Sequence, residues 1–181
     1  MTGSDLFGRE EDIAFLDAVH ALARKQNEPV LMIGALSALA ITHYFSGNFQ
    51  FSGQHAMRGV QIWRSGIAQS PLEEIDVPGV ACLCYEAMFK WHSGEINASK
   101  AAIEEAISLE QQLNDMHGLA VALHFAAILA RSERNPAEVE RLASDLIELS
   151  IRQTLCVGCL VGTFFEAGRT ALQRTPPKAF R

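Results

Sequence analysis

Apolar residues recur every three or four positions between Pro78 and Leu113, which is the spacing of an amphipathic helix. The first stripe consists of Ala81, Cys84, Tyr85, Met88 and Trp91. The second stripe consists of Ala98, Ala102, Ile103, Ala106 and Leu109. Ser93 and Gly94 separate the two stripes, and glycine readily takes the positive φ that a tight turn between helices needs. The pattern predicts two antiparallel helices that need neighbours on both sides to cover their apolar surface.

Further helices are predicted by similar stripes, by Pro29 at a first helical turn and by a segment dense in Ala and Leu, and no stretch of the chain is typical of a strand. These helices are expected over residues 10–26, 29–45, 49–68, 119–132, 137–150 and 154–172. Residues 69–77 contain Ser70-Pro71 and are expected to form a loop. The sum is an all-α chain of about eight helices. Its expected organisation is a flexible start over residues 1–10, a single helical domain over 11–173 and a flexible end over 174–181.

Three windows of the sequence repeat one another. They begin at Ala35, Ala81 and Ala120. Gly47 and Gly94 align at the predicted turns, and Arg134 falls at the same place in the third window. Ser52 and Ser99 align five positions after the glycines. Self-similarity at such a period is typical of a solenoid, in which each helix pair contacts its neighbours along the stack.

The turn glycine, the small residue that follows it and the alanines between the helices together resemble a tetratricopeptide (TPR) repeat array. That resemblance implies a right-handed solenoid of antiparallel helices. The turns are 47 and 40 residues apart, whereas an ordinary TPR has a period of ~34 residues. Packing of the HEAT-repeat type therefore remains the alternative.

A narrower resemblance rests on four segments: VPGVACLCYEAMFKWHSGE, ASKAAIEEAISLEQQLND, GLAVALHFAAIL and PAEVERLASDLIEL. They are similar to the TPR-like C-terminal regions of large bacterial signalling regulators. In that group the region follows a STAND-type ATPase module, itself often preceded by a nucleotide cyclase, a protein kinase or a DNA-binding domain. This sequence contains no such module and no P-loop motif, so the resemblance implies no enzymatic activity here.

Composition limits the classes of partner. Of the 181 residues 49% are hydrophobic and 20% charged, which excludes extended disorder. The net charge of −6 disfavours a nucleic-acid phosphate backbone as the partner. The chain has no apolar run of ~18 residues and no signal-peptide layout at its start. We therefore expect a cytoplasmic protein with neither a nucleic-acid nor a membrane partner.

The residue types that catalyse reactions are present but scattered. Cys82 and Cys84 lie roughly 200° apart around a helix, so they cannot face one metal ion together. Cys156 and Cys159 form a lone C-x-x-C without a matching second pair. Small buried thiols are the expected reading of all four, and a thiol or metal site at Cys156 and Cys159 is the alternative. We expect no enzyme, no cofactor and no metal.

A binding surface is the remaining candidate for function. In TPR-like stacks the first helix of each pair lines the concave face, and by resemblance this face would carry Tyr44, Phe45, Tyr85, Met88, Trp91, His92, His124, Phe125 and Arg131. Each of these residues has core packing between repeats as its alternative role. The expected function is a non-catalytic regulatory scaffold that binds a protein segment or an apolar effector in this aromatic groove. The alternative is self-association, for example as a homodimer through the apolar final helix.

Overall fold

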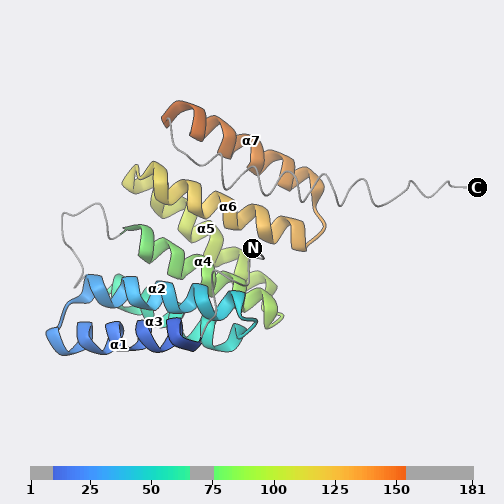
Figure 1. The fold of residues 1–181 in the computed structure, drawn as a ribbon. Helices are drawn as coiled ribbons and strands as arrows, with labels where there is room; N and C mark the ends of the chain where they lie inside the picture. Colours follow the sequence, from blue (N-terminus) through green and yellow to red (C-terminus); the bar gives the residue numbers. More distant parts are fainter. Residues whose placement is uncertain (1–9, 66–75, 154–181) are drawn as a thin grey trace, which may run out of the picture.

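The computed structural model describes residues 10–65 and 76–153, and these residues form seven α-helices with no strand among them (Figure 1). The helices are α1 (Glu10–Gln26), α2 (Pro29–Phe45), α3 (Phe49–Arg64), α4 (Asp76–His92), α5 (Ile96–Leu113), α6 (Met116–Ser132) and α7 (Pro136–Gln153). The expected all-α class is therefore confirmed for the described residues. The expected eighth helix over 154–172 and the expected end over 174–181 lie outside them, as do residues 1–9 of the expected start.

Several helix ends differ from the sequence-based expectation. Residues 69–75 of the expected loop lie outside the described residues, and Asp76 and Val77 belong to α4 instead. Helix α4 holds Pro78 in its first turn, where a missing N–H is tolerated. Helix α6 begins three residues earlier than expected, because the Asp115 side chain caps it by accepting a 2.8 Å hydrogen bond from the His117 N–H. Helix α3 ends at Arg64 rather than at residue 68.

The short turns between helices share one backbone geometry. Each contains one residue with positive φ: Asn27 at 55°, Gly47 at 78°, Gly94 at 84°, Asn114 at 56° and Arg134 at 58°. In each turn the next N–H donates to the carbonyl oxygen five residues earlier, at 2.8–3.1 Å. This bond satisfies one of the carbonyl groups left open at a helix end. Gly47 and Gly94 thus occupy the turns that the repeat predicted.

Helix α4 lies at the centre of the described structure. It packs against α3 and α5, its neighbours along the chain, and against α2 and α6, which flank it in space (Figure 1). Every residue from Cys82 to Met88 is buried. Helices α2, α4 and α6 therefore form a row, and α3, α5 and α7 each pack on the preceding member of that row. Helix α1 packs on α2 at one end.

Glycines allow α3 and α4 to approach closely. A Cβ at Gly53 would overlap the Phe89 ring, and a Cβ at Gly79 would lie 2.6 Å from the Trp63 ring. Trp63 therefore packs against α4 from α3, the second helix of its pair. Real Cβ atoms do not approach other heavy atoms within 3 Å, so the missing side chains set the spacing of the two helices.

Candidate binding surface

Aromatic rings from α2, α3, α4 and α6 form a continuous row of contacts, named here the aromatic row. Its ring centroids are 4.0 Å apart for Phe49 and His92, 5.8 Å for His92 and Tyr44, 5.4 Å for Tyr44 and Tyr85, 4.9 Å for Tyr85 and Phe125, and 5.7 Å for Phe125 and His124. Most of these pairs are tilted or edge-to-face, as the ring quadrupoles favour. The row crosses the first helix of each of the three helix pairs.

Two further rings attach to this row. Phe45 contacts Tyr44 edge-on at 5.6 Å, and Trp91 contacts His92 at 5.1 Å. The structure therefore joins seven of the nine residues predicted for the binding surface through ring contacts. The remaining two are Met88 and Arg131.

Three of the nine predicted residues are buried. Tyr85 is 5% exposed, Met88 2% and Phe125 9%. They belong to the core that α4 forms with its neighbours, which is the alternative role that the sequence left open for each of them. Buried rings cannot contact a ligand directly, so these residues serve to hold the accessible members of the row in place.

The accessible part lies at the ends of α2 and α4 that meet the turns. Phe45 is 60% exposed. His92 is exposed, and Tyr44, Phe49 and Trp91 are half-buried. These five residues are named here the aromatic patch. Half-buried His124 and exposed Arg131 lie on α6, the helix that follows α2 and α4 in the row of first helices.

The titratable rings of the patch and of neighbouring His124 favour their neutral forms near neutral pH. Burial lowers the pKa of His92 and of His124, so both imidazoles favour the neutral form. Burial raises the pKa of Tyr44, and the positive charge of Arg131 opposes that effect. The Tyr44 hydroxyl lies 3.5 Å from His92 Nε2. The surface is thus aromatic and neutral, with one cation close enough to Tyr44 to act on its phenol.

Sequence reasoning missed Phe49 as a member of the patch. Phe49 begins α3, the second helix of its pair, whereas the concave-face rule considers only first helices. Its ring stacks on His92 of the following pair at an interplanar angle of 11°. The available signal was its position directly after the turn that follows Tyr44 and Phe45, where it returns to the same end of the stack.

Three histidines, His20, His43 and His55, gather where α1, α2 and α3 meet. His43 and His55 stack at 5.3 Å with an angle of 5° between the rings. His20 is close enough to lower the pKa of His55 electrostatically. Burial is the main reason that the pKa of His20, His43 and His55 is lowered in each case. These residues come from separate helices, so their spacing along the chain gives no sign of the cluster.

The two cysteines among the described residues are unreactive thiols. Cys82 and Cys84 are free and buried, as expected. Burial raises the pKa of Cys82 to about 12 and raises that of Cys84 as well, so both remain thiols. Cys156 and Cys159 lie outside the described residues. Among residues 10–65 and 76–153, no group of three or more His, Cys, Asp or Glu side chains is placed to hold a metal ion.

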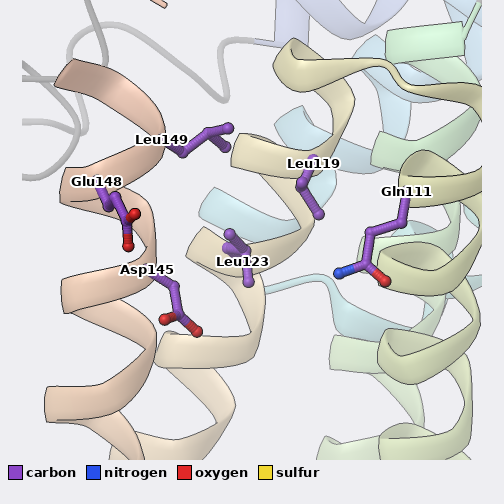
Figure 2. A pocket seen from close by; sticks show the side chains of 6 residues that line it. All are labelled: Gln111, Leu119, Leu123, Asp145, Glu148 and Leu149. Atoms are coloured by element: carbon purple, nitrogen blue, oxygen red, sulfur yellow. The ribbon is translucent and has the colours of Figure 1, made fainter. Parts of the chain in front are cut away.

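An open hollow lies between α5, α6 and α7 and shares no residue with the aromatic row (Figure 2). Leu119 and Leu123 of α6 and Leu149 of α7 form its apolar walls. Gln111, Asp145 and Glu148 supply its polar lining. Asp145 already pairs with Arg141 at 2.8 Å. The residues that line the hollow include no nucleophile next to a base, so the aromatic patch remains the candidate site.

Comparison with protein-family models and with curated proteins finds no match to this chain. None of the helices in the described part of the chain is long and apolar enough to cross a membrane.

Proposed function

We propose that this chain is a non-catalytic interaction module of TPR-like architecture that binds an apolar protein segment at the aromatic patch. The single observation that carries the proposal is the exposed Phe45 ring, seated on a connected set of half-buried rings. The exposed part of the Phe45 ring adds little to the stability of a monomer, whereas exposed apolar clusters with polar edges are typical of interaction sites.

The types of side chain in the patch support the same function. Tyr44 and Trp91 combine a large apolar body with a polar atom, and such residues dominate the binding energy of protein interfaces. Their contacts with Tyr85 and His92 restrict their rotamers before any ligand arrives. A pre-ordered side chain loses less conformational entropy on binding, so each contact contributes more to affinity.

The arrangement of helices supports the proposed architecture. Helices α2, α4 and α6 contact one another in order, as first helices do in a TPR-like right-handed solenoid. We propose that their shared surface is the concave face and that an extended or helical segment lies across it.

The cellular role is proposed from the sequence resemblance alone. The chain would act in the cytoplasm as a regulatory part of a bacterial signalling protein, with no nucleic-acid partner and no membrane partner. The expected self-association through the final helix concerns residues outside the described structure, so the described residues offer no support for it.

The test is selection of binding peptides from a displayed random library on the immobilised chain, followed by measurement of Kd by fluorescence anisotropy. We expect selected peptides to be rich in apolar residues. Phe45→Ala and Trp91→Ala should each weaken binding by at least ~2 kcal/mol, roughly thirtyfold in Kd. Phe51→Ala is the matched control, because Phe51 is 55% exposed on α3 and its ring contacts His43 instead of the patch.

Two results would contradict the proposal. In the first, Phe51→Ala weakens binding as much as Phe45→Ala, which would place the ligand elsewhere. In the second, Trp91→Ala lowers the free energy of unfolding strongly while the peptide Kd stays unchanged. Trp91 would then be a core residue between helix pairs.

A further inference from the structure

Helix α1 carries a second stripe on the side opposite the one that packs. This stripe is apolar in its middle and charged at its two ends. The packed side holds Ile13, Leu16, His20 and Ala23, all partly or fully buried. The outward stripe consists of Glu11, Phe15, Ala18, Leu22 and Lys25, all of them exposed. Phe15 is 68% exposed and Leu22 53%. A helix that needs only one buried side has polar residues on the other, so the outward stripe requires an explanation.

The outward stripe has the spacing of a helix–helix interface. Its members are separated by four, three, four and three residues, which is the a/d pattern of a coiled coil. The small Ala18 lies at its middle, the large Phe15 and Leu22 on either side, and opposite charges at its ends. A small residue at the centre lets two helix backbones come close where they cross. Among the described residues, α1 packs chiefly on α2, which leaves this side uncovered.

We propose that two copies of the chain associate through this stripe, with α1 of one copy antiparallel to α1 of the other. A two-fold axis through Ala18 places Phe15 beside the partner's Leu22 and Glu11 beside the partner's Lys25. Each contact then occurs twice, as an isologous interface requires. The opposed helix dipoles also favour this direction.

The charge order along α1 selects this pairing over the parallel one. In a parallel pair Glu11 would face the partner's Glu11, and Lys25 would face the partner's Lys25. Like charges at both ends would oppose that pairing. In the antiparallel pair both repulsions become attractions. The charges of two copies of the stripe are therefore complementary only when the helices run antiparallel.

The first measurement is sedimentation of the full chain from low micromolar to submillimolar concentration. We expect the average mass to rise from 19.8 kDa toward twice that value. Phe15→Ser should raise the dimer dissociation constant at least ~10-fold. Ile151→Ser is the matched control, because Ile151 is 76% exposed on α7, away from the stripe, and its replacement should leave the constant unchanged.

The second measurement tests direction with charge reversal. Glu11→Lys and Lys25→Glu should each weaken self-association, and an equal mixture of the two variants should restore it, because each copy then faces an opposite charge at both ends. The double variant E11K/K25E should also restore it. A parallel pair would instead leave the double variant with like charges facing each other. Circular dichroism of each variant verifies that the fold is retained.

Three outcomes would overturn the proposal. The chain stays monomeric at every concentration, or Ile151→Ser weakens the dimer while Phe15→Ser does not, or the charge-reversed mixture fails to recover. A monomer in which Phe15→Ser lowers the melting temperature would show that another part of the same chain covers the stripe. None of these results depends on the aromatic patch, so the dimer and the proposed peptide binding can fail separately.

Discussion

The hydroxyl group of Ser99 donates a 2.8 Å hydrogen bond to the carbonyl oxygen of Ala87, twelve residues earlier on the facing helix. Ser52 makes the same bond to Ala40 at 2.7 Å in the preceding helix pair. Both serines are 1% exposed. The third pair has Val139 at the corresponding position and makes no such bond, since valine has no hydroxyl group. The aligned serines of the sequence repeat thus perform one structural task, which is to fasten the second helix of a pair to the first.

Loss of this bond should destabilise the fold. Ser99→Ala and Ser52→Ala should each lower the free energy of unfolding by about 1 kcal/mol, the usual net contribution of a buried hydrogen bond. Chemical denaturation followed by circular dichroism measures the change. Ser108→Ala is the control, because Ser108 lies exposed on the same helix as Ser99. An equal loss in this control would mean that the serine–carbonyl bond is not the cause.

Because the turn residues have positive φ, substitutions at two of them should change the stability of the fold in opposite directions. Gly94→Val should cost on the order of 1–2 kcal/mol, because a β-branched residue is strained at the φ of 84° found there. Arg134→Gly should instead stabilise the fold by up to ~1 kcal/mol, because arginine holds a φ of 58° that glycine adopts freely. Thermal or urea unfolding of the two variants checks both signs. A stabilised Gly94→Val would contradict the turn geometry.

Two helical glycines should respond differently to alanine. A Cβ at Gly53 would overlap the Phe89 ring, so Gly53→Ala should destabilise by ~1–3 kcal/mol through overpacking. No atom lies within 4 Å of the Cβ position at Gly34, so Gly34→Ala should stabilise by ~0.5–1 kcal/mol through helix propensity. Denaturant midpoints of the two variants provide the comparison. Similar midpoints would show that α3 and α4 are not in close contact at Gly53.

The free energy of unfolding should fall in mild acid. Burial lowers the pKa of His20, His43 and His55 below the usual 6.5, so the folded chain favours their neutral form. A group whose pKa is lowered by folding contributes its full stability above the unfolded pKa and loses it as the pH falls through the folded value. The positive charges of Arg24 and Arg58 act in the same direction on His20, and Asp17 opposes them.

Urea unfolding at pH 7.5 and at pH 5.5 measures this effect. His43→Gln should flatten the pH dependence, since it removes one of the buried titrating groups. His117→Gln is a suitable control because His117 is exposed on α6, outside the cluster. A dependence that is unchanged in His43→Gln would exclude His43 as one of its sources.

Replacement of a core residue should lower the free energy of unfolding more than replacement of a partly exposed one. Leu146 is 4% exposed on α7, so Leu146→Ala should cost ~2–5 kcal/mol through the cavity that it leaves. Trp91 is only partly buried, and Trp91→Ala should cost less in spite of its larger volume. Thermal unfolding of both variants gives the comparison. A larger loss for Trp91→Ala would place its indole in the core between helix pairs.

The helices and most of their turns follow from the amino-acid sequence alone. Apolar spacing, Pro29 at the start of α2 and the Ala- and Leu-rich composition of α6 together predicted the seven described helices, and aligned glycines predicted the turns at Gly47 and Gly94. These features depend on residues within a few positions of one another, so they can be predicted from the sequence. The start of α6 differed because the Asp115 cap competes with Gly118 as a boundary signal.

Which members of the predicted binding surface are accessible depends on how the helices pack against one another. Tyr85 and Phe45 look alike in the sequence as aromatic residues on first helices, yet one is 5% exposed and the other 60%. The difference arises because α4 has helices on all sides whereas Phe45 lies at the exposed end of α2. The histidine cluster and the Phe49–His92 stack were hidden for the same reason. Such contacts join residues from different helices, and sequence spacing records only the distance along one helix.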